Sequence, residues 1–67
     1  MSQSKNIESK NLEIIKDQME AECLLNKKFN VYSGQAVDNQ MKTLFNEASQ
    51  IHKQNFTSLK TYLDSHS

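Results

Sequence analysis

The stretch GQAVDNQM (residues 34–41) separates two apolar patterns and decides how the chain folds. Gly34 is the only glycine among 67 residues and there is no proline, so little else interrupts helices. The break falls either at Gly34 or in the segment Val37-Asp38-Asn39. We favour the second position, because the apolar pattern continues past Gly34 and Asp38 is a good N-cap for a following helix.

Each side of this break reads as one long helix. The first is expected over residues 10–36, with Ser9 supplying an N-cap oxygen and Glu13 an acidic group near the free amides of the first turn. The second is expected over residues 39–64, where apolar residues recur at nearly heptad spacing. The polar stretch 1–9 is expected to be a disordered tail and the Ser-His-Ser end to fray, which leaves one domain over residues 10–65.

These patterns predict an all-α fold, an antiparallel helical hairpin. A lone hairpin covers only one side of each apolar stripe, so we expect a second copy to close a four-helix bundle, as a homodimer with two-fold symmetry. The alternative is a monomer whose open face is covered by its own tail or by a foreign partner. The residues expected in the core or dimer interface are those of the two stripes: Leu12, Ile15, Met19, Leu25, Phe29, Tyr32, Leu44, Phe45, Ala48, Ile51, Phe56, Leu59 and Tyr62.

Composition argues against several classes of partner. Eight lysines balance eight acidic residues, there is no arginine, and the lysines are scattered, so nucleic acid is not expected as a partner. No run approaches the roughly 20 apolar residues that a membrane span requires. Cys23 is the only cysteine, which suits a reduced thiol and synthesis in the cytoplasm. No arrangement of nucleophile and base is apparent, so an enzyme is not expected.

Glu22 and His52 stand fifteen residues either side of the turn, each within an apolar stripe. A hairpin brings them to the same height, and Asn55 lies one helical turn from His52. Burying such a polar layer is costly, so it needs a reason. In carboxylate-bridged dimetal bundles two helices supply Glu and two supply Glu-x-x-His, whereas this chain has His52-Lys-Gln-Asn55. We therefore expect a hydrogen-bonded cluster of Glu22, His52 and Asn55 that fixes register, with no cofactor.

Two metal-binding alternatives stay open for the same three residues. A functional dinuclear site is the weaker one, because a dimer offers too few carboxylates for two divalent cations. The other is a single transition metal ion held by His52 of both subunits, with Glu22 and Asn55 beside it.

Several further features carry a family resemblance. They are the position of Glu22 along the first helix and its spacing to Phe29 and Tyr32, the segment DNQMK (residues 38–42), Leu44-Phe45, and the second helix from Ala48 to Tyr62. On these residues the stretch 16–63 resembles the small ferritin-like proteins of spore-forming bacteria, including the spore coat F-type family. Asn39 stands where that family often has proline.

The resemblance implies a hairpin that dimerises into a ferritin-like four-helix bundle, expressed in sporulation and placed in or near the spore coat, with other coat proteins as further partners. His52 and Asn55 depart from the pattern of its metal-binding members. We therefore expect a non-enzymatic structural or assembly protein that self-associates through its apolar helix faces. The alternatives are a metal-binding ferritin-like protein using Glu22 and His52, and a helical adaptor for a larger partner.

Overall fold

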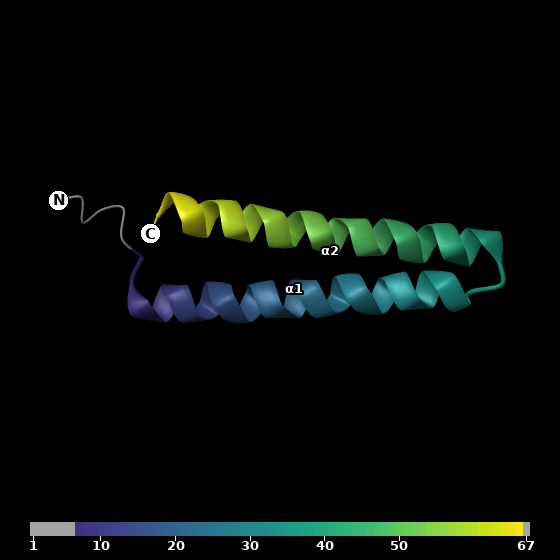
Figure 1. The fold of residues 1–67 in the computed structure, drawn as a ribbon, viewed down its shortest axis with the longest axis horizontal. Helices are drawn as coiled ribbons and strands as arrows, with labels where there is room; N and C mark the ends of the chain where they lie inside the picture. Colours follow the sequence, from purple (N-terminus) through teal and green to yellow (C-terminus); the bar gives the residue numbers. More distant parts are fainter. Residues whose placement is uncertain (1–6, 67) are drawn as a thin grey trace.

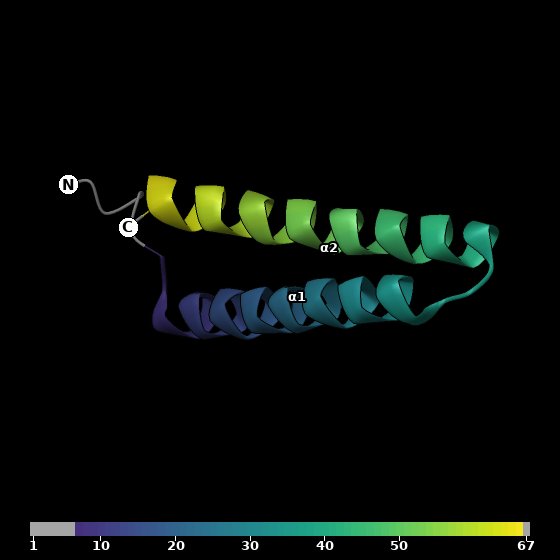
Figure 2. The ribbon, with the colours of Figure 1, turned by 45° about the vertical axis from the view of Figure 1, so that its right-hand side comes forward.

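The chain folds as two antiparallel α-helices joined by a short turn (Figure 1). The computed structural model describes residues 7–66. Helix α1 spans Ser9–Gln35 and helix α2 spans Asn39–Ser65, and the two lie side by side along their whole length in both views (Figures 1 and 2). The described part of the chain contains no strand. The predicted helical hairpin is thus confirmed.

The turn lies where Asp38 predicted it and not at Gly34, which is inside α1. The backbone N–H of Ala36 donates to the carbonyl of Tyr32 and closes the last turn of α1. Asp38 then caps α2, because its Oδ1 accepts from the backbone N–H of Gln40 at 2.7 Å. Beside the turn, the Ser33 hydroxyl donates to the carbonyl of Lys42 at 3.2 Å and links the two helices.

Both outer helix ends differ in detail from the sequence expectation. The N-cap of α1 is Glu8 and not Ser9, and the Glu8 side chain makes no capping hydrogen bond. Ser9 is already helical, so it does not belong to the tail; residues 1–6 of the expected disordered tail lie outside the described residues. At the other end, α2 continues through Ser65, and His66 stacks on Tyr62 with ring centroids 4.0 Å apart. The described part of the Ser-His-Ser end thus continues α2 and its C-cap.

The helices meet along a seam whose members are spaced alternately by three and four residues, the spacing of a two-stranded coiled coil. These positions are less exposed than their neighbours, and in α1 they include Glu22 and Asn26. Glu22 and Asn26 interrupt the apolar pattern of α1, but they still take part in the contact between the two helices. The seam consists of Leu12, Ile15, Met19, Glu22, Asn26, Phe29 and Ser33 on α1 with the C-cap residue Ala36, and of Phe45, Ser49, His52, Phe56, Leu59 and Leu63 on α2.

Three aromatic residues, Phe29 and Phe45 of the seam and Tyr32 beside it, gather between the turn and the middle of the hairpin. Phe29 stacks on Phe45 with centroids 5.9 Å apart, and Tyr32 contacts both rings. His52 extends this cluster, because its ring is stacked on Phe29 with ring centroids 5.6 Å apart. The aromatic cluster thus extends to the polar layer and holds the imidazole in place.

The hairpin has no closed apolar core. Among the described residues no hydrophobic side chain is fully buried, and the two buried residues are polar, Glu22 and Ser49. Two helices in contact along one line leave most of each apolar stripe uncovered. Within the same part of the chain, neither helix is long and apolar enough to cross a membrane.

Candidate functional site: a polar layer at the middle of the hairpin

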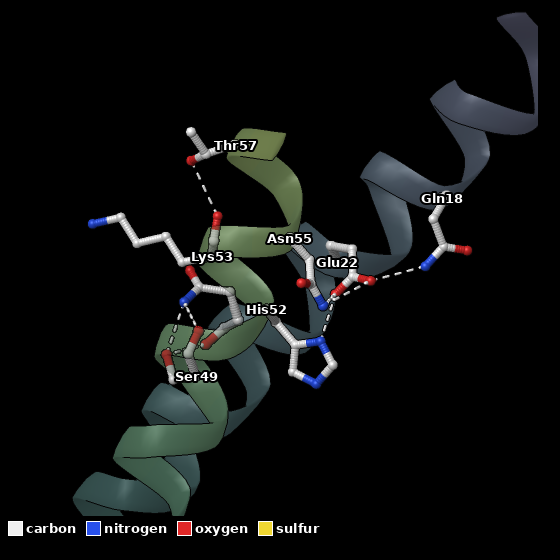
Figure 3. A network of polar contacts seen from close by, with 8 residues as sticks. Gln18, Glu22, Ser49, His52, Lys53, Asn55 and Thr57 are labelled. Atoms are coloured by element: carbon white, nitrogen blue, oxygen red, sulfur yellow. Dashed lines mark hydrogen bonds and ion pairs between the residues drawn. The ribbon is translucent and has the colours of Figure 1, made fainter. Parts of the chain in front are cut away.

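Glu22 and His52 meet in the structure, as their distances from the turn predict. Each stands at the midpoint of its helix, and His52 Nδ1 lies 2.5 Å from Glu22 Oε1 (Figure 3). Glu22 is 7% exposed, so its carboxylate requires partners that replace water. The imidazole is fixed from two directions, by this carboxylate and by the stacked ring of Phe29.

Two amide side chains complete the surroundings of the carboxylate. Gln18, one turn earlier on α1, donates its Nε2 to Glu22 Oε2 at 2.9 Å. Asn55 places its Nδ2 at 3.5 Å from both carboxylate oxygens, a long and weak contact (Figure 3). The predicted cluster of Glu22, His52 and Asn55 therefore forms, and Gln18 is a member that the sequence analysis missed.

These contacts set the electrostatics of the layer. The hydrogen bond with His52 lowers the pKa of Glu22 below its ordinary value of 4.5, and the hydrogen bond from Gln18 acts in the same direction. Burial of the carboxyl group opposes them and is outweighed, because three side chains stabilise the charged form. Glu22 is therefore an ionised acceptor at neutral pH, at the centre of the hairpin.

A second polar cluster lies one turn closer to the hairpin loop, and sequence analysis did not find it. Ser49 is 0% exposed, and its hydroxyl accepts from Asn26 Nδ2 at 2.8 Å. The same hydroxyl lies 3.1 Å from the Asn26 carbonyl and 2.9 Å from Asn30 Oδ1, the two acceptors for its single proton. Asn26 Nδ2 also donates to the Ser49 carbonyl at 2.8 Å.

The spacing of Ser49 was the signal that could have revealed it. Ser49 follows Phe45 by four residues and precedes His52 by three, which is the seam spacing. A search for apolar residues passes over a serine in that position. Asn26 reaches across the seam at this position and donates to both the carbonyl and the hydroxyl of Ser49.

The described residues offer little for holding a metal ion within one chain. Over residues 7–66, no group of three or more His, Cys, Asp or Glu side chains is gathered as a metal site. Glu22 and His52 supply two ligand types and Asn55 a neutral amide oxygen. Cys23 is a half-buried free thiol next to Glu22 in sequence. A metal centre would therefore need ligands from a second chain.

The thirteen residues expected in the core or dimer interface divide into two sets. Tyr32, Leu44, Ile51 and Tyr62 are exposed in the single hairpin, at 39, 61, 55 and 46%. The other nine are half-buried: Leu12, Ile15, Met19, Leu25, Phe29, Phe45, Ala48, Phe56 and Leu59. The hairpin itself therefore covers the second set only in part and leaves the first set open.

Comparison with known proteins found no protein similar to this chain. No family model matches the chain, and neither a curated protein nor a solved structure matches it.

Proposed function

We propose that this protein is a non-enzymatic structural or assembly protein that works by self-association, two hairpins closing a ferritin-like four-helix bundle. The observation that carries the proposal is the exposure of large apolar side chains on a hairpin without a core. Ile14, Leu24, Val31, Leu44 and Ile51 each keep between 55 and 62% of their surface exposed. Leu24 and Val31 line one hollow on α1 together with Leu25, and exposed apolar side chains that gather in this way mark an interaction site.

Burial of this surface supplies the driving force. Apolar area removed from water contributes about 25 cal/mol per Å². A chain of this size gains little of it alone, because a single core in so short a chain is marginal. Pairing with a second copy supplies the missing cover.

The polar layer fits a structural role within such an assembly. Glu22 and His52 satisfy one another and leave no nucleophile beside a base. Buried polar pairs of this kind are best known for fixing register and pairing geometry. We assign that role to Glu22 and His52: they hold α1 and α2 level, so that the two apolar stripes are presented together.

The biological setting we propose comes from the resemblance of residues 16–63 to the spore coat F-type family. In that setting the hairpin is a component of the spore coat, and other coat proteins are its further partners. The hairpin architecture is compatible with this resemblance.

Sedimentation equilibrium and native mass measurement test self-association directly. The parent should be a dimer. Phe29→Asp and Leu59→Asp should each give a largely unfolded monomer, because both place a charge in the seam. Gln54→Asp, at an exposed position of α2, is the matched control and should stay a folded dimer. A stable, folded monomeric parent would contradict the proposal and favour the adaptor.

The contact between Glu22 and His52 also favours a second candidate, a metal-binding ferritin-like protein. A carboxylate that holds one ring nitrogen of a histidine leaves the other nitrogen free to bind a metal ion, a common arrangement around metal sites. Titration with iron, manganese and zinc, followed by native mass measurement, decides between the two. Stoichiometric binding abolished by His52→Ala would favour this candidate, whereas no binding at micromolar metal would exclude it.

A further inference from the structure

On one side of the hairpin the rows that flank the seam are uncharged apart from Lys28, which follows Ala21 by seven residues, and we call this side the uncharged face. On each helix its members flank the seam on one side at spacings of three, four and seven residues. The uncharged face consists of Ile14, Gln18, Ala21, Leu25 and Tyr32 on α1 and of Met41, Leu44, Ala48, Ile51, Asn55 and Tyr62 on α2.

Contacts in the structure place these two rows on the same side of the hairpin. Gln18 and Asn55 reach the carboxylate of Glu22 together. Nearer the turn, Tyr32 and Met41 line one shallow hollow. The rows of the two helices thus form one continuous surface.

The opposite side of the hairpin has a different character. It carries the cluster of Asn30 and Ser49, and Lys16 and Lys42 lie at heptad spacing from these two residues. Lys53 follows Ser49 by one turn and is exposed. This side thus carries several lysines, whereas the uncharged face has only Lys28 at its edge. Because lysine is seldom buried, the uncharged face is the side better suited to a partner.

We infer that the uncharged face binds the same face of a second copy, with the two turns at the same end of the bundle. This inference rests on the proposed self-association and specifies its surface and orientation. Each α1 then lies over α2 of the second copy, so that Leu25 meets Ile51, Tyr32 meets Leu44, and Ile14 meets Tyr62 across the interface.

The size of the uncharged face fits a second copy. Two helices of 27 residues, each about 40 Å long and 10 Å wide, present a face on the order of 800 Å². A stable interface of standard size buries about this area on each partner. A second hairpin covers the whole face, whereas a single helix covers about half.

The polar residues of the face decide the orientation. Gln18 and Asn55 lie away from the turn, beyond the midpoints at Glu22 and His52, and the half of the face nearer the turn is apolar except for Lys28 at its edge. With the turns at the same end, Gln18 of one copy lies level with Asn55 of the other, and the amides can pair. With the turns at opposite ends, the same amides would lie against Leu25 and Ala48, where the amide oxygens, which do not contact Glu22, would be buried without a donor.

The first experiment tests the surface. Ile51→Lys should raise the dimer dissociation constant by at least tenfold in sedimentation, because Ile51 lies within the proposed interface. Gln54→Lys adds the same charge to the same helix outside the uncharged face and should leave the constant within twofold of the parent. Equal dissociation constants for the two variants would overturn the proposed surface, even if the parent is a dimer.

The second experiment tests the orientation on the full chain in a Cys23→Ser background. Val37 is 96% exposed at the turn, so a spin label on Val37→Cys should disturb neither the helices nor the interface. Turns at the same end should give a distance between labels of about 25 Å or less, and turns at opposite ends about 40 Å or more, the helix length. The long distance would overturn the orientation and leave self-association standing, whereas a monomer would overturn both.

Discussion

Ser49 is the residue whose substitution tests this packing most directly. It is fully buried, and its hydroxyl accepts one hydrogen bond from Asn26 and donates one towards Asn26 or Asn30. Ser49→Ala removes the hydroxyl and leaves the backbone contacts in place. The change therefore isolates the side-chain hydrogen bonds of the second polar cluster.

The expected loss follows from these contacts. Two hydrogen bonds at about 1 kcal/mol each set an upper value near 2 kcal/mol. Asn30 is exposed and can bond water instead, and Asn26 keeps its bond to the Ser49 carbonyl, so the loss should fall towards 1 kcal/mol. Alanine also favours a helix over serine by about 0.5 kcal/mol, which offsets part of the loss.

Urea unfolding followed by circular dichroism at one protein concentration measures the effect. Ser58→Ala, at an exposed position of α2, provides the same gain in helix propensity without a buried hydroxyl. Ser49→Ala should be less stable than Ser58→Ala by about 1–2 kcal/mol. Ser49→Leu should be less stable still, by a further 1–3 kcal/mol or so, because the position has no room for a larger side chain. Equal stability of the two alanine variants would refute the assignment of these hydrogen bonds.

Three further predictions concern the polar layer and the turn. The pKa of Glu22 is lower in the folded chain, so its contribution to stability is present at neutral pH and is lost as the pH falls below 4.5. In acid unfolding, Glu22→Gln should therefore lose less stability with falling pH than the control Glu20→Gln. Parallel curves of stability against pH for the two variants would count against the ionised layer. Gly34→Ala should raise the free energy of unfolding by about 0.5–1 kcal/mol in the same urea assay, because Gly34 is helical and an added Cβ meets no atom within 4 Å. A loss of stability would mean that another chain covers the helix surface at Gly34. Asp38→Ala should lower it by about 1 kcal/mol through loss of the cap on Gln40, and Asp38→Asn should retain most of that stability.

Local features were predictable from the sequence because their causes are local. Asp38 caps the helix that directly follows it, so the position of the turn could be recognised without tertiary information. The meeting of Glu22 and His52 followed from the same turn, because a hairpin places residues at equal distances from its turn side by side. The start of α1 was less accurately predicted, since Glu8 is the N-cap and makes no side-chain bond that a sequence pattern could reveal.

The rotation of each helix about its own axis could not be predicted in this way. The sequence pattern presents the apolar stripes as one set, yet the structure divides them: Phe29 and Phe45 face the seam, while Leu44 and Ile51 face outward. Hydrophobicity does not distinguish the two sets, because all four side chains are apolar. The division is made by which side of each helix packs against the other.

The sequence by itself therefore determined two helices, the turn between them and the level at which Glu22 and His52 meet, because capping and chain connectivity act over a few residues. Only the tertiary structure decided that Ser49 is the most buried of the described residues and that Leu44 and Ile51 stay exposed. The physical reason is that burial depends on which sides of two helices come together, and this depends on contacts between residues far apart in the chain.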